Sequence, residues 1–155
     1  MAVEQGRDGG RIVVGVDGSE SSDAALAWAV RQAGLTGARI DAVSAWQIPA
    51  TYGLGYAMAS PDLEKIAGQV LDAAIAKATA ATPDVHIDPV VVQDNPAQAL
   101  LDAAEGADLL VVGSRGRGGF TGALLGSVGQ HCVQHAVCPV VVIRGHGGDA
   151  IHRRA

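Results

Sequence analysis

The sequence predicts an α/β domain built on a five-stranded, all-parallel, doubly wound sheet with strand order 3-2-1-4-5 and helices on both faces. The first observation behind this prediction is that short, continuous apolar runs alternate with segments of helical periodicity, which is typical of strands buried on both faces and joined by helices. The second is that right-handed crossovers allow few orders for such a chain, and this order is a common one. A length of 155 residues with 48% apolar content suits one folded domain.

Five short apolar runs predict the strands. They cover residues 12–16, 40–46, 85–92, 109–112 and 139–144. Four segments between them carry apolar residues at spacings of three and four, which predicts helices with one apolar face. These segments cover about residues 21–34, 61–78 and 96–104, and the last runs from Leu125 or Gly126 to about residue 136.

Side chains that can cap a helix precede three of these segments. Ser21 or Ser22 can accept a hydrogen bond from the first turn of the first helix. Ser60 stands before Pro61, a residue suited to the first helical position, and Asn95 precedes the third helix. The clearest apolar stripe belongs to the second helix and consists of Leu63, Ile66, Ala67, Val70, Leu71, Ala74, Ile75 and Ala78.

Composition and charge argue against several classes of function. The net charge of −5, without a basic run, argues against nucleic-acid binding. No apolar stretch is long enough for a membrane span and the polar N-terminus has no signal region, so we expect a cytoplasmic protein with no membrane contact. The domain is expected over residues 11–144, between a disordered N-terminus (1–10) and a disordered tail (145–155). Cys132 and Cys138 are interpreted as small buried hydrophobic residues, with a redox pair as the minor alternative.

The most informative segment is a glycine-rich loop that follows the apolar run at 109–112. Gly113-Ser-Arg-Gly116 is followed, after nine residues, by Gly126-Ser127 and a predicted helix. Glycine lets backbone N–H groups approach an anion closely, and a helix start adds unpaired N–H donors, so the arrangement is typical of a phosphate cradle. It matches neither common nucleotide fingerprint, because the only two lysines lie far away in the sequence and no third glycine completes G-x-G-x-x-G.

A second signal lies at the same predicted edge of the sheet. Asp17 ends the first strand and Gly113 ends the fourth, and these strands are neighbours in the order 3-2-1-4-5. In such sheets ligands bind beyond the carboxyl ends of the strands, at the point where the order reverses. The acidic turn and the glycine loop are therefore expected to form one crevice.

The spacing Gly113-x2-Gly116-x9-Gly126-Ser127 resembles the ATP-binding signature of the universal stress protein family. Two further segments, 12–19 and 135–144, are similar to that family's first strand with its acidic turn and to its C-terminal end. The resemblance implies a Rossmann-like, single-domain, ATP-binding protein that acts in stress response or signalling. It also implies a homodimer paired through the last strand, whose apolar edge would be exposed in a monomer.

The resemblance assigns roles on the nucleoside side of the crevice. Asp17 would hydrogen-bond the nucleoside, the alternative being an ordinary Asp-Gly-Ser turn. Gly15 would let the first strand approach the base, or would simply give packing clearance. Ala45 would contact adenine through its backbone.

On the phosphate side, the glycines of the motif would shape the cradle, unless they form only a surface loop. Ser127 would donate its hydroxyl, and its N–H and that of Val128 would face the phosphates; a simple N-cap is the alternative for Ser127. Arg115, favoured over Arg117, would steady the polyphosphate or keep the loop soluble. Gly119 would help the loop fold over the ligand. The complete predicted set is Gly15, Asp17, Ala45, Gly113, Ser114, Arg115, Gly116, Gly119, Gly126, Ser127 and Val128.

The identity of the ligand and its fate stay open at this point. Position 129 is Gly where the family often carries another hydroxyl residue, so ADP and AMP compete with ATP as the expected ligand, with Mg²⁺ accompanying it. Asp17 is the only evident carboxylate at the crevice and no general base accompanies it, which favours a nucleotide sensor with at most slow turnover. The alternatives are a slow ATPase or autophosphorylating enzyme, and a dimeric scaffold that binds no nucleotide.

Two histidines in the last predicted helix, His131 and His135, are spaced by one helical turn. This spacing can hold a metal ion, but no second pair of ligands with zinc-site spacing accompanies them. A solvent-facing or interface helix is therefore the preferred interpretation, and no metal site is predicted.

Overall fold

The computed structural model describes residues 9–48, 62–115 and 125–145. Within them, five parallel strands form one sheet in the predicted order, β3-β2-β1-β4-β5. The predictions of disorder at the two ends of the chain fall, apart from Gly9, Gly10 and Gly145, outside the described residues. The strands are β1 (Arg11–Gly15), β2 (Arg39–Trp46), β3 (Ile87–Gln93), β4 (Leu109–Gly113) and β5 (Val140–Ile143).

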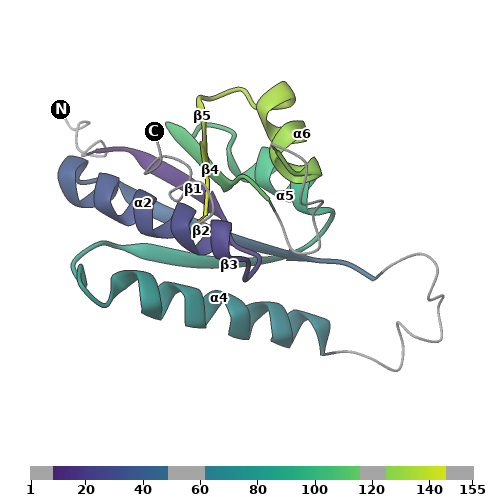
Figure 1. The fold of residues 1–155 in the computed structure, drawn as a ribbon, viewed down its shortest axis with the longest axis horizontal. Helices are drawn as coiled ribbons and strands as arrows, with labels where there is room; N and C mark the ends of the chain where they lie inside the picture. Colours follow the sequence, from purple (N-terminus) through teal and green to yellow (C-terminus); the bar gives the residue numbers. More distant parts are fainter. Residues whose placement is uncertain (1–8, 49–61, 116–124, 146–155) are drawn as a thin grey trace, which may run out of the picture.

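Helices cover both faces of the sheet, as predicted (Figure 1). One face carries α2 and α4, and the other carries α5 and α6. Among the described helices, none combines the length and the apolar character that crossing a membrane requires. The helices are α2 (Glu20–Thr36), α4 (Leu63–Thr79), α5 (Pro96–Ala103) and α6 (Ser127–His135).

The core is divided by the sheet into two apolar clusters. Alternate residues of β1 point to opposite faces, so that Val14 packs under α2 and α4 with Leu26 and Leu71, whereas Val13 packs on the other side. Cys132 is buried in that second cluster, and burial raises the pKa of its thiol to about 11. A buried thiol with a raised pKa is a poor nucleophile, which supports the interpretation of this cysteine as a small hydrophobic residue.

The first helix begins earlier than predicted. Its N-cap is Ser19, whose hydroxyl accepts a hydrogen bond from the Ser22 N–H at 3.2 Å, so the assignment of the cap to Ser21 or Ser22 was wrong. Both of those side chains are buried and make other hydrogen bonds. Gly37 caps the C-terminal end of the helix. It adopts a left-handed conformation with φ of 82° and donates its N–H to the Ala33 carbonyl.

The helix α4 follows its predicted stripe only in part. Ala67, Leu71 and Ala74 are buried, but Ile66 is 51% exposed. Asp62 occupies the N-cap position without a side-chain cap, and the predicted cap Ser60 and Pro61 lie outside the described residues.

The start of α5 offers a test of the local folding signals. Asn95 accepts hydrogen bonds from the N–H groups of Ala97 at 2.9 Å and Gln98 at 3.2 Å, so it caps the helix that was predicted to start at Asn95-Pro96. Replacing Asn95→Ala removes both acceptors, so we expect the free energy of unfolding in urea to fall by about 1 kcal/mol. The variant Asn95→Ser keeps an acceptor at this position and should retain most of the stability. Equal stability of the two variants would contradict the capping role.

Candidate functional site

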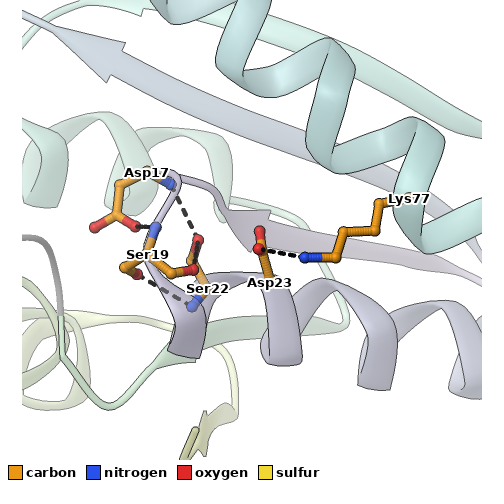
Figure 2. Close-up of polar contacts among 5 residues, drawn as sticks. All are labelled: Asp17, Ser19, Ser22, Asp23 and Lys77. Carbon is orange, nitrogen blue, oxygen red and sulfur yellow. Dashed lines mark hydrogen bonds and ion pairs between the residues drawn. The ribbon is translucent and has the colours of Figure 1, made fainter.

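The turn between β1 and α2 holds Asp17 at the carboxyl edge of the sheet (Figure 2). The chain stays paired with β2 as far as Val16, whose N–H donates to the Val43 carbonyl at 2.8 Å, and then leaves the sheet. The half-buried Asp17 accepts a hydrogen bond from the Ser19 N–H at 2.9 Å through Oδ1, and its own N–H donates to the Ser22 hydroxyl at 3.2 Å. Asp17 therefore does serve as a turn residue, and the same contacts fix the position of its carboxylate.

The first residues after β4 are tied to the start of α2. The Ser21 hydroxyl donates to the Arg115 carbonyl, and the Arg115 N–H donates back to the same Ser21 oxygen at 3.2 Å. The Ser19 hydroxyl approaches the same carbonyl at 3.4 Å. Ser19, the N-cap of α2, and Ser21, in its first turn, thus hold the entry of the glycine-rich loop, whose own residues 116–124 lie outside the described residues.

Gly113 makes this contact between β4 and α2 sterically feasible. A Cβ atom at residue 113 would lie 2.6 Å from the carbonyl carbon of Ser21, a backbone atom that cannot move aside without shifting the helix. This glycine is therefore required by packing, independently of any ligand. The alternative of a loose surface loop does not fit the position of Gly113, which lies against α2.

The start of α6 is fixed to the same edge through main-chain bonds. The Ser114 N–H donates to the Ile143 carbonyl at 2.8 Å, and the Gly126 N–H donates to the Ser114 carbonyl at 2.6 Å. Gly126 is the N-cap of α6 and brings no capping side chain. The first N–H groups of a helix have no acceptor within it, so those of Ser127 and Val128 are available at this edge as anion donors.

Gly129, the position at which the resemblance implied a hydroxyl residue, is buried in this first turn. A Cβ atom there would lie 2.9 Å from Cδ1 of Leu125, so a larger residue would require that side chain to move. The absence of a side-chain hydroxyl at position 129 thus goes with the close packing of the first turn of α6 against Leu125.

Ala45 lies beyond the end of the pairing between β2 and β1, while β2 is still paired with β3. In a parallel strand, successive residues direct their N–H and C=O groups alternately to the two adjoining strands. The Val43 carbonyl faces β1 and the Trp46 carbonyl faces β3, where it accepts from Asp94, so the backbone groups of Ala45 face the side of β1. The β1–β2 ladder ends at Gly15 and Val43, so these groups border the space above β1.

Gly15 has a packing role in the structure. A Cβ atom at this position would lie 2.8 Å from Cδ1 of Leu100 on α5, a contact that a shift of the leucine side chain could relieve. The packing of Gly15 against Leu100 neither requires nor prevents the predicted approach of a base to β1.

The structure brings together most of the described residues predicted for the site, at the carboxyl edge around β1, β4 and α6. Gly116 and Gly119 lie outside the described residues. Residues that the sequence interpretation missed are Ser19 and Ser21, which hold the loop, and Glu20, a second carboxylate in the first turn of α2 beside Gly145. A run of hydroxyl residues directly after an acidic turn was the available signal.

Comparison with known proteins bears on the fold and on the family of this chain. A model of the universal stress protein family matches residues 10–144. The universal stress protein Rv2623 of Mycobacterium tuberculosis is 40% identical over 136 residues, which make up 86% of this chain but 44% of that protein. The chain therefore spans less than half the length of this curated relative.

Solved structures of similar length share the fold. The universal stress protein UspA from Lactobacillus plantarum matches with a TM-score of 0.73 and 25% identity over 88% of this chain and 98% of that chain. A universal stress protein solved in complex with cAMP matches with a TM-score of 0.66 and 30% identity over 88% of this chain and 97% of that chain. With the sheet order, the glycine spacing and the family match in agreement, the chain belongs to the universal stress protein family.

Proposed function

We propose that this chain binds an adenine nucleotide at the carboxyl edge of its sheet, between the acidic turn after β1 and the N-terminus of α6. The observation that carries the proposal is the set of hydrogen bonds that joins Asp17, the loop entry at Arg115 and the helix start at Gly126 into one edge. A carboxylate suits sugar hydroxyls, and unpaired helix amides suit phosphate. The cAMP-bound relative supports the choice of an adenine nucleotide.

Each part of the nucleotide has a matching group in this arrangement. Adenine would pair with the backbone of Ala45, whose N–H and C=O offer a donor and an acceptor toward the space above β1. The ribose would lie against Asp17. The phosphates would accept hydrogen bonds from the N–H groups of Ser127 and Val128.

We infer that the ligand is ATP and that the protein acts as a nucleotide sensor in a stress response. Gly129 supplies no hydroxyl, so the phosphate tail has one hydrogen-bond donor fewer than in relatives that carry one, and ADP or AMP remain competitors. Mg²⁺ is usually held by one or two carboxylates together with phosphate oxygens, and Asp17 and Glu20 are the carboxylates near this edge.

Turnover of the nucleotide is expected to be slow. Fast phosphoryl transfer needs a metal-holding carboxylate and a residue that orients the attacking group. The sequence offers no general base beside Asp17, whose carboxylate also accepts the Ser19 N–H. Steady phosphate release from purified protein would instead favour the slow ATPase.

The described sheet has one blocked edge and one open edge, which supports a homodimer paired through β5. On β3, the residues that face outward include Pro89, which has no N–H to offer a further strand. On β5, the Pro139 and Ile143 carbonyls face β4, so by alternation the backbone groups of Val140 and Val142 face outward. These residues can pair with a second copy.

A proline at the first position of α6 tests the amide cradle. Proline is well suited to this position of a helix and removes one N–H group, and Gly126 before it is already extended with ψ of 170°. Ser127→Pro should therefore weaken ATP and AMP binding by roughly tenfold or more, because a hydrogen bond to a charged group contributes about 1.5–3 kcal/mol. Isothermal titration measures the change.

Two controls accompany this variant. Ser127→Ala keeps the N–H and removes only the hydroxyl, so the difference between the variants isolates the amide. Adenosine, which has no phosphate, should bind Ser127→Pro and the unaltered chain equally. An equal loss of adenosine binding would indicate a misplaced helix, and unchanged AMP binding would overturn the cradle.

A second variant separates the two roles of Asp17. Asp17→Asn retains an oxygen that can accept from the Ser19 N–H, so the turn and the melting temperature should be preserved. It loses the negative charge and one acceptor, so adenosine affinity should fall by about tenfold. If adenosine binds this variant as it binds the unaltered chain, Asp17 is only a turn residue.

Pairing through β5 is tested by copying the proline of β3 onto the open edge. Val142→Pro removes an outward N–H and spares the ladder with β4, so the dimer should dissociate while the chain stays folded. Analytical ultracentrifugation measures the mass and circular dichroism measures the fold. Val142→Thr keeps the N–H and should remain dimeric. A dimer that survives Val142→Pro would place the interface elsewhere.

A further inference from the structure

The exposed face of α6 carries two imidazoles close together at its C-terminal end. His131 and His135 are one helical turn apart, and their ring centroids lie 4.4 Å from each other with the ring planes inclined by 43°. Both side chains are exposed to solvent. The two rings are therefore held on one side of the helix, near enough for a single ion to contact both.

These rings differ from the other described histidine in their surroundings. His86 lies 3.0 Å from a carboxylate oxygen of Asp88. Within the described ranges, neither His131 nor His135 has a hydrogen-bonding or ion-pairing partner, and α6 itself contains no acidic residue. Among the described residues, no carboxylate or thiol joins these rings to form a group of three, so the two ring nitrogens are the metal-binding donors identified at this position.

We propose that His131 and His135 chelate one divalent transition-metal ion of the class Zn²⁺, Cu²⁺ and Ni²⁺. Imidazole nitrogen suits these ions, whereas Mg²⁺ and Ca²⁺ prefer oxygen ligands. Two ligands one turn apart on a formed helix are already in place for a chelate. The negative end of the helix dipole, in the turn that contains His135, also favours a cation.

The ion would occupy a site separate from the nucleotide. Ser127 begins α6 and the ion would lie between His131 and His135, so the two sites are separated by about 9 Å along the helix axis at a rise of 1.5 Å per residue. No third ligand from the described part of the chain completes the set, so water or a second copy would fill the other coordination positions. The proposal is independent of the proposed function.

Titration of the full chain with ZnCl₂ tests the site. One ion per chain should bind, and His131→Ala or His135→Ala should each weaken binding by at least about tenfold, because even the loss of an outer-shell partner costs a metal site 10–100-fold. Half an ion per chain would also support the proposal, with two copies supplying their histidine pairs to one ion. MgCl₂ should not bind at these residues.

Three further variants make the result specific. Exchanging positions, with His135→Val and Val133→His, keeps the composition but turns one ring away from the other, so it should abolish the chelate; Val133 is exposed and tolerates the change. His86→Ala should bind zinc as the unaltered chain does. A third control, His146→Ala with His152→Ala, removes the tail histidines and should also leave binding intact. Absence of zinc binding, or binding lost only in the tail variant, would overturn the site.

Discussion

The carboxyl edge of this sheet depends on the contact between the start of α2 and the end of β4. Ser21 exchanges two hydrogen bonds with Arg115, and Gly113 is the residue that lets the two backbones approach closely enough. The turn that holds Asp17 comes just before Ser21 in the sequence, and the glycine-rich loop begins directly after Arg115. A shift of α2 along the sheet would therefore move the carboxylate and the loop entry together.

Most of the other links at this edge use the main chain. Ser114 bonds to β5 and to Gly126 through its backbone, and Val16 bonds to β2 in the same way. The groups proposed to bind phosphate are likewise amides, not a lysine side chain. Backbone dipoles act over a shorter distance than a full charge, so this site would gain affinity from geometric fit and little from long-range attraction. The rigidity of the edge is then a condition for binding.

The sequence was sufficient for the strand order, because apolar runs alternating with helical periodicity leave few right-handed topologies. It also placed Asp17 and Gly113 at one edge, because the predicted order makes their strands neighbours. It failed at the cap of α2, where Ser19, Ser21 and Ser22 are chemically equivalent. The choice among them is made by tertiary contacts, since Ser21 is engaged by Arg115, 94 residues away, and Ser22 by the Asp17 N–H. Local propensity contains no information on such partners. The orientation of the Ala45 backbone likewise follows from register, which a single sequence does not specify.

The proline in β3 has a consequence for how copies of this chain can associate. A sheet with two usable edges can add neighbours on both sides and grow without limit into a fibre. Because Pro89 lacks an N–H on the outer side of β3, strand addition to the described sheet is favoured at β5, and two molecules joined there would each have used that strand. Growth by this route would then stop at a pair.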